Sequence, residues 1–151
     1  MSDYKNRQKT YLRLYSEDKT GGSYTSPTFN LTHNIEDISA FQITDFFIRY
    51  TDSASQSIKI NSIELSNLST DRMQGSYDSA NQTIHEFQTQ YSSNTAGNEG
   101  GNRQLSVSPI YNSSNGRISK ISFDFLNMDG TNAATNFTTL DKWTMLLCFY
   151  H

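Results

Sequence analysis

The chain has 151 residues and a formal net charge of −3, and its length suits a single domain with a core of its own. The negative charge argues against non-specific binding of nucleic acid, because neutralising phosphates requires clustered Lys and Arg. Its single cysteine, Cys148, excludes an internal disulfide and is typical of a protein made in a reducing compartment.

The first residues are polar and show no periodicity. Residues 1–9 are therefore predicted to form an arm that orders only against something else, and residues 10–151 to form the domain. The arm holds the one local basic cluster of the sequence, Lys5, Arg7 and Lys9, which we interpret as a solvated tail. No apolar run approaches the roughly 18–20 residues of a membrane span, and the arm lacks the apolar region of a signal peptide.

The next segments alternate apolar and polar residues, which indicates strands. Residues 11–15 place Leu12 and Leu14 on one face, and residues 28–31 repeat the pattern in a shorter form. Residues 33–38 are predicted to form a short helical turn, with Asn34 as its N-cap. Residues 40–50 carry apolar side chains on both faces, which predicts a strand in the middle of a sheet.

The central third is harder to assign. Residues 58–60 and 63–65 keep a period of two only if a β-bulge lies between them, and 68–73 are expected to continue that ribbon. Residues 79–91 fit a helical stripe and a strand equally well, so both assignments stay open. Residues 92–103, interrupted by glycines, are predicted to form a loop.

The last third predicts a hairpin and a buried strand. Residues 105–111 and 118–126 flank Asn112–Gly116, and Asn-Gly between alternating runs favours a hairpin turn. Residues 131–141 are expected to form a loop anchored by Phe137 and Leu140. Residues 143–150 are apolar on both faces, which predicts a fully buried strand with a neighbour on each side.

These elements predict an all-β protein. Serine, threonine and asparagine supply 51 of the residues and charged residues only 18%, a composition that suits β-surfaces and loops better than amphipathic helices. About eight short antiparallel strands, with at most one short helix, are typical of a β-sandwich of the single jelly-roll type.

No group of residues predicts a reaction. The three histidines, His33, His85 and His151, have no partner at metal-ligand spacing. Two pairs of acids, a calcium-like run at 127–132 and a Ser-x-x-Lys spacing at 16–19 are better explained by solvated turns. Cys148 lies in the apolar last run and is interpreted as a small hydrophobe. We therefore expect no catalytic residue, no cofactor and no metal, and hence no enzyme.

Tyrosines in or beside predicted loops are the remaining lead. This group consists of Tyr4, Tyr24, Tyr77 and Tyr111. Tyrosine is favoured at interfaces because it adds rigid contact area at low entropic cost. The same side chains could stack on sugars, or simply cover the ends of strands.

Taken together, several features resemble one protein family. They are the short alternating strands, the Asn/Ser/Thr-rich surface, the polar arm, the Gly75-Ser76-Tyr77 segment and the aromatic closing run at 143–150. In these respects the chain is similar to the single jelly-roll capsid proteins, penton and minor capsid proteins included, of tailless icosahedral double-stranded DNA viruses such as virophages and large DNA viruses.

The resemblance implies a structural protein of the virion, made in the host cytoplasm. It implies a homo-oligomer, with a pentameric ring favoured, that assembles through strand edges and loops and contacts neighbouring capsid proteins. The arm would reach adjacent subunits, and Tyr4 and Arg7 are the candidate contact residues. Because the arm is not strongly basic, we expect no direct binding of nucleic acid.

Two other classes stay open. One is a receptor- or glycan-binding head, such as a trimeric C1q- or TNF-like knob or a phage fibre tip. The other is a carbohydrate-binding module, in which tyrosines should line one face of a sheet. The assembly state separates them, because a pentamer, a trimer and a sugar-binding monomer are the respective expectations.

Overall fold

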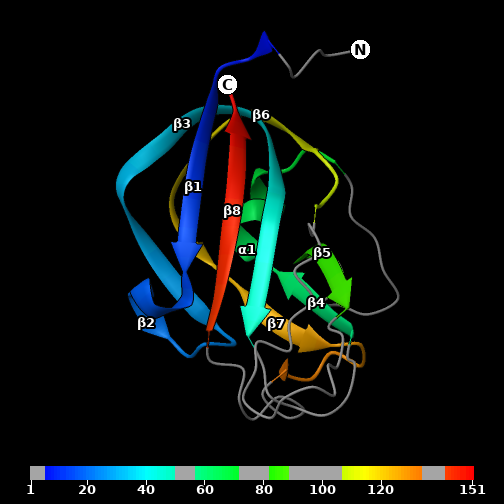
Figure 1. The fold of residues 1–151 in the computed structure, drawn as a ribbon. Coiled ribbons are helices and arrows are strands. Elements are labelled where there is room, and N and C mark those ends of the chain that lie inside the picture. Colours follow the sequence, from blue (N-terminus) through cyan, green and yellow to red (C-terminus); the bar gives the residue numbers. More distant parts are fainter. Residues whose placement is uncertain (1–5, 50–56, 72–81, 89–106, 134–141) are drawn as a thin grey trace.

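The computed structural model describes residues 6–49, 57–71, 82–88, 107–133 and 142–151. Within them the chain forms two antiparallel sheets and a single α-helix of six residues (Figure 1). The prediction of an all-β sandwich with one short helix is confirmed. None of the described helical segments has the length and apolar character needed to cross a membrane.

The larger sheet has the strand order β1-β8-β3-β2, and β6 joins it by pairing with β3. Its strands are β1 (Lys9–Tyr15), β2 (Gly21–Gly22), β3 (Pro27–Arg49), β6 (Tyr111–Ser122) and β8 (Lys142–Tyr150), with the 3-10 turn η2 (Ser16–Asp18) after β1. The smaller sheet has the order β5-β4-β7. It contains β4 (Ser57–Asn61), β5 (Thr83–Gln88) and β7 (Asp124–Asn127), and helix α1 (Ile63–Leu68) follows β4.

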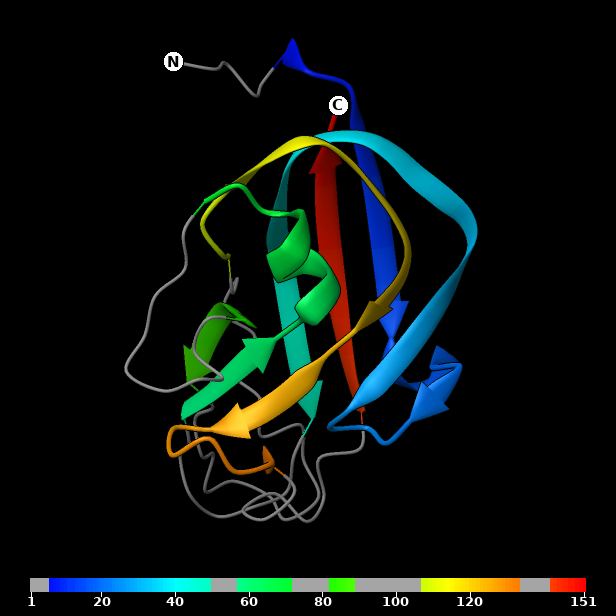
Figure 2. The ribbon, with the colours of Figure 1, turned by 180° about the vertical axis from the view of Figure 1, so that it is seen from behind.

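Strand β3 is part of the larger sheet and bends over from one layer of the sandwich toward the other (Figures 1 and 2). It has 23 residues and curls over one end of the molecule, as Figures 1 and 2 show from opposite sides. Its first part pairs with β6 and its second part with β8. Register shifts between Asn30 and Ala40, and a φ of 53° at Asp37, mark the bend. These irregularities replace the helical turn predicted at 33–38, which is wrong.

Strand β8 lies between β1 and β3, so the prediction of a buried central strand at 143–150 is confirmed. Trp143 at its start is 2% exposed and packs edge-on against Phe125, with ring centroids 5.1 Å apart. Trp143 also contacts Phe29 and Phe46. Its indole N–H donates to the Tyr24 carbonyl oxygen at 3.0 Å. This aromatic cluster joins the two layers.

Helix α1, at Ile63–Leu68, corrects the prediction of a bulged ribbon at 63–65; of the predicted continuation at 68–73, Ser69 forms a β-bridge with Ser113 and residues 72–73 lie outside the described residues. The Ser62 hydroxyl accepts from the Leu65 N–H at 3.3 Å and caps the helix. Leu65 is fully buried, whereas Ile63 is 48% exposed. Leu65 and half-buried Leu68 hold this short helix against the core, and the alternation of Ile63 and Leu65 resembles that of a strand.

The predicted hairpin at Asn112–Gly116 is also wrong, because β6 runs through it. Between the pairs Ile38–Gly116 and Ala40–Asn112, β6 contains two more residues than β3. Asn115 has a φ of 53°, so its left-handed conformation forms a bulge instead of a turn. A Cβ on Gly116 would lie 2.0 Å from Leu68 Cδ1, which explains a glycine at this close approach to α1.

The ambiguous segment resolves as a strand where it is described: β5 covers Thr83–Gln88 and pairs with β4. The predicted loop at 92–103 and the anchors Phe137 and Leu140 lie outside the described residues.

Candidate interaction surface

Strand β1 lies at the border of the larger sheet and pairs, among the described residues, with β8 alone (Figure 1). The His151 N–H donates to the Gln8 carbonyl oxygen at 2.9 Å, and the two residues continue the β1–β8 register. Hydrogen-bonded pairs alternate along an antiparallel ladder. The backbone groups of Thr10, Leu12 and Leu14 therefore point toward β8, and those of the residues between them point away from it.

The outward backbone groups belong to Lys9, Tyr11, Arg13 and Tyr15. Their side chains all lie on the outer face of the sheet, where Tyr11 is 59% and Tyr15 47% exposed. On the opposite face Leu14 is buried, and Leu12 is half-buried against the core. One strand thus offers an open backbone edge, two exposed aromatic rings and two cations.

The N-terminal end of β1 is held to the rest of the domain by side-chain hydrogen bonds. The Arg7 guanidinium donates to the Ser39 hydroxyl at 2.6 Å. His151 Nδ1 donates to the Glu36 carbonyl oxygen at 2.8 Å, and its Nε2 is hydrogen-bonded to the Thr10 hydroxyl at 2.7 Å. Arg7, one of the two contact residues expected from the sequence, therefore lies against β3. Tyr4, the other, lies outside the described residues, and the contact role of both stays a prediction.

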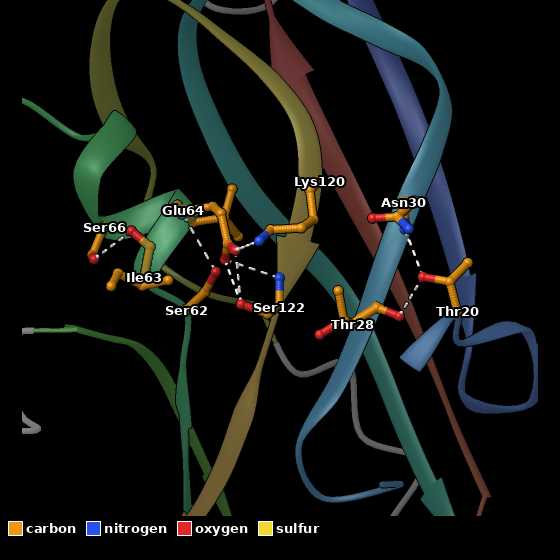
Figure 3. A network of polar contacts seen from close by, with 10 residues as sticks. Thr20, Thr28, Asn30, Ser62, Ile63, Glu64, Ser66, Lys120 and Ser122 are labelled. Atoms are coloured by element: carbon orange, nitrogen blue, oxygen red, sulfur yellow. Dashed lines mark hydrogen bonds and ion pairs between the residues drawn. The ribbon is translucent and has the colours of Figure 1, made fainter. Parts of the chain in front are cut away.

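A second strand edge is handled differently. Along the edge of β6 that faces α1, the Glu64 carboxylate accepts from the Ser122 N–H at 2.9 Å and from its hydroxyl at 2.7 Å. The Lys120 ammonium lies 3.8 Å from the same carboxylate (Figure 3). Farther along, the Asp71 carboxylate accepts from the Asn112 N–H at 2.7 Å. Side-chain carboxylates, together with an isolated β-bridge between Ser69 and Ser113, thus take the place of a neighbouring strand at this edge.

A groove of about 460 Å³ lies between α1 and β6. Glu64 and Lys120 line one part of it, and Ser113, Gly116 and Arg117 line another. Arg117 lies 3.6 Å from Glu36. The Ser113 hydroxyl is buried from water and has no hydrogen-bond partner among the described residues. The groove therefore contains charged groups that already have partners, and it holds no arrangement of nucleophile and base.

The remaining sequence candidates occupy structural positions. In the calcium-like run, the Thr131 N–H and hydroxyl donate to Asp129, which lowers the pKa of that carboxyl group. Ser16 accepts from the Trp143 N–H at 3.0 Å. Burial lowers the pKa of His85 and raises that of Cys148, and Cys148 packs in a small cluster with Ala40 and Tyr150. The described part of the chain has no group of three His, Cys, Asp or Glu side chains placed to bind a metal.

Of the tyrosines expected at the surface, the structure describes Tyr24 and Tyr111, and both are less exposed than Tyr11 and Tyr15. Tyr24 is 37% exposed and stacks under the Lys19 ammonium at 4.2 Å, whereas the Tyr111 hydroxyl donates to the Ile84 carbonyl oxygen at 2.8 Å. Tyr77 lies outside the described residues. Sequence reasoning missed Tyr11 and Tyr15, although the alternation that placed Leu12 and Leu14 inward also places these two rings outward.

A scan against models of known protein families finds no match to this chain, and a search of curated proteins finds no similar sequence.

Proposed function

We propose that the protein is a non-enzymatic structural subunit of a virus capsid, at the vertex or in a minor position. The observation that carries the proposal is the open edge of β1, a seven-residue strand with exposed Tyr11 and Tyr15 beside it. Proteins that act as monomers commonly blunt or cover such edges, because an unpaired edge is a template for association. A rigid sandwich with an edge left open suits a subunit that assembles.

The proposal places the protein in a homo-oligomer within the capsid, with a pentameric ring favoured. Its resemblance to single jelly-roll capsid proteins supports this reading, and the two-layered antiparallel fold is compatible with it. In a ring, one weak contact is repeated around the symmetry axis, so that a small edge contributes to a closed assembly.

Native mass spectrometry of the full chain, together with negative-stain electron microscopy, tests the proposal. A pentamer, or a fivefold ring in class averages, is the expected result. A stable trimer would favour a receptor- or glycan-binding head instead. A monomer at all concentrations that binds no capsid component would contradict the proposal.

A carbohydrate-binding role is the second candidate, and one observation favours it. Tyr11 and Tyr15 lie on the same face of one strand, where two rings could stack on successive sugar units. A glycan array, followed by titration of any hit against a Tyr11→Ala/Tyr15→Ala double variant, measures this directly. Retention of binding by the double variant would contradict a role for this face.

A further inference from the structure

We propose that the open edge of β1 accepts one extended, acidic segment of a partner polypeptide whose sequence differs from that of this chain. The segment adds a strand beside β1. The inference deepens the proposed capsid function and rests on it for the source of the partner, a neighbouring capsid protein.

The backbone provides the first step. The N–H and C=O groups of Lys9, Tyr11 and Arg13 point away from β8, as the alternation of the β1–β8 ladder requires. An extended segment can pair with all of them while β8 keeps its own bonds to Thr10, Leu12 and Leu14. Strand addition of this kind obtains affinity from main-chain hydrogen bonds and specificity from alternate side chains.

The charges define which segment fits. Lys9 and Arg13 are four residues apart on the outer face, with Tyr11 between them, and both are exposed. Among the described residues Arg13 has no ion-pair partner, and the Lys9 ammonium lies 5.6 Å from the Tyr150 ring. In a neighbouring strand the residues directly opposite are also four apart. Carboxylates at positions i and i+4 of the partner would therefore face both cations.

The inner face adds an apolar requirement. Half-buried Leu12 and buried Leu14 lie on this face of β1, against the core. The side chains of the three partner residues between the two acids also point to opposite faces in turn. The first and the third of these residues therefore face inward. An apolar residue opposite Leu12 would cover the exposed part of that side chain. The other inward-facing residue lies opposite Thr10, so the pattern requires two acids four positions apart with an apolar residue next to the acid that faces Arg13.

A second copy of this chain does not provide such a segment. Its sequence has 15 Asp and Glu residues, and no two of them are four positions apart. Pairing two β1 edges about Tyr11 places Lys9 opposite Arg13, and pairing about Arg13 places two arginines opposite each other, both of which are repulsive. Pairing about Leu12 avoids these contacts and remains an outcome to be tested.

Fluorescence anisotropy with a labelled peptide containing Glu-Val-Tyr-Val-Glu tests the proposal on the full chain. We expect saturable binding that a Lys9→Glu/Arg13→Glu variant weakens by at least about tenfold. A peptide with Lys in place of both Glu residues should bind that variant better than it binds the unaltered protein. Equal affinity for the acidic and basic peptides would overturn the inference.

A backbone variant separates strand addition from simple charge attraction. Tyr11→Pro removes an outward N–H, keeps both cations, and leaves the bonds to β8 intact, because proline is tolerated at strand edges. We expect loss of peptide binding with Tyr11→Pro and retention with Tyr11→Ala, the matched control for the missing ring. Binding by Tyr11→Pro as tight as by Tyr11→Ala would rule out strand addition. If Tyr11→Pro does not fold, the test of the proposal is the comparison of the acidic and basic peptides on the Lys9→Glu/Arg13→Glu variant and the unaltered protein.

The two proposals fail in different ways. A pentamer that does not bind the acidic peptide would leave the capsid proposal intact and overturn the edge inference. A monomer that binds the peptide in the expected pattern would contradict the capsid proposal and support the edge inference. A dimer whose formation competes with the peptide would identify a second copy as the occupant and overturn the inference.

Discussion

The edges of β6 and β1 differ in how their outward backbone groups are satisfied. At β6, helix α1 and the residues after it provide Glu64 and Asp71, whose carboxylates accept from Ser122 and Asn112. At β1 the described residues provide no such acceptor along Lys9–Tyr15. The comparison teaches that this fold covers the edge of β6 with its own residues, whereas the edge of β1 stays open among the described residues.

The difference follows from chain connectivity. Helix α1 comes directly after β4, so the Ser62 cap and buried Leu65 hold Glu64 against β6. Beside β1, the chain turns through η2 and then pairs Gly21 and Gly22 with β3. The edge of β6 is therefore covered by residues of the same domain, whereas the edge of β1 lies at the surface of the domain.

The largest expected effect is on the aromatic core between the two sheets. Trp143→Ala removes the ring that contacts Phe29, Phe46 and Phe125 between the layers, and we expect a loss of about 3–5 kcal/mol in the free energy of unfolding. Urea denaturation followed by circular dichroism measures it. Tyr15→Ala, on the exposed face, is the control and should change stability little. A loss below about 1 kcal/mol in Trp143→Ala would contradict the assigned core.

The next prediction concerns the covered edge. Glu64→Ala leaves the Ser122 N–H and hydroxyl without their acceptor, and a loss of about 1–3 kcal/mol is expected in the same assay. Glu36→Ala is the matched control, because Glu36 and Arg117 are exposed and their ion pair contributes less than about 1 kcal/mol. Equal losses in the two variants would show that Glu64 is an ordinary surface acid.

A smaller effect is expected at the bulge in the covered edge. Gly116→Ala places a methyl group 2.0 Å from Leu68 Cδ1, and because that atom ends a flexible side chain the loss should be about 1 kcal/mol. Adding Leu68→Ala should relieve the contact, so that the two changes are not additive in a double-mutant cycle. Strict additivity would mean that β6 and α1 do not meet as described.

The smallest effect is expected at the open edge. Arg13→Ala should change the free energy of unfolding by no more than about 0.5 kcal/mol, because the exposed guanidinium has no ion pair among the described residues. The same variant should weaken binding of the acidic peptide. A loss of stability larger than that of Gly116→Ala would show that this edge, like that of β6, is engaged within the domain.

Much of the fold was predictable from alternation. The period of two at 11–15 predicts a strand with one buried face, which is β1. The continuous apolar run at 143–150 predicts a strand buried on both faces, which is β8, between β1 and β3. The bulge at Asn115 was not predictable in the same way. Asn-Gly permits positive φ in a turn and in a bulge alike, and pairing with β3 decides between them.

The open edge was not predictable from the sequence. Which backbone groups of β1 point outward depends on the β1–β8 register. That register is defined by tertiary pairs such as Lys9 with Tyr150, which form only in the folded protein. Side-chain alternation does place Tyr11 and Tyr15 on the outer face. Glu64 gave no signal either, because its partner Ser122 lies 58 residues away along the chain.

The pairing of β8 with both β1 and β3 has a consequence for synthesis on the ribosome. Residues 9–15 and the second half of β3 emerge long before residues 142–150, yet the strand that separates them in the sheet is β8. Until β8 emerges, the apolar surfaces of β1 and of the second half of β3 lack the strand that pairs with both. Such exposed surfaces favour binding by chaperones or premature association. Formation of the native sheet is thereby linked to the synthesis of residues 142–150.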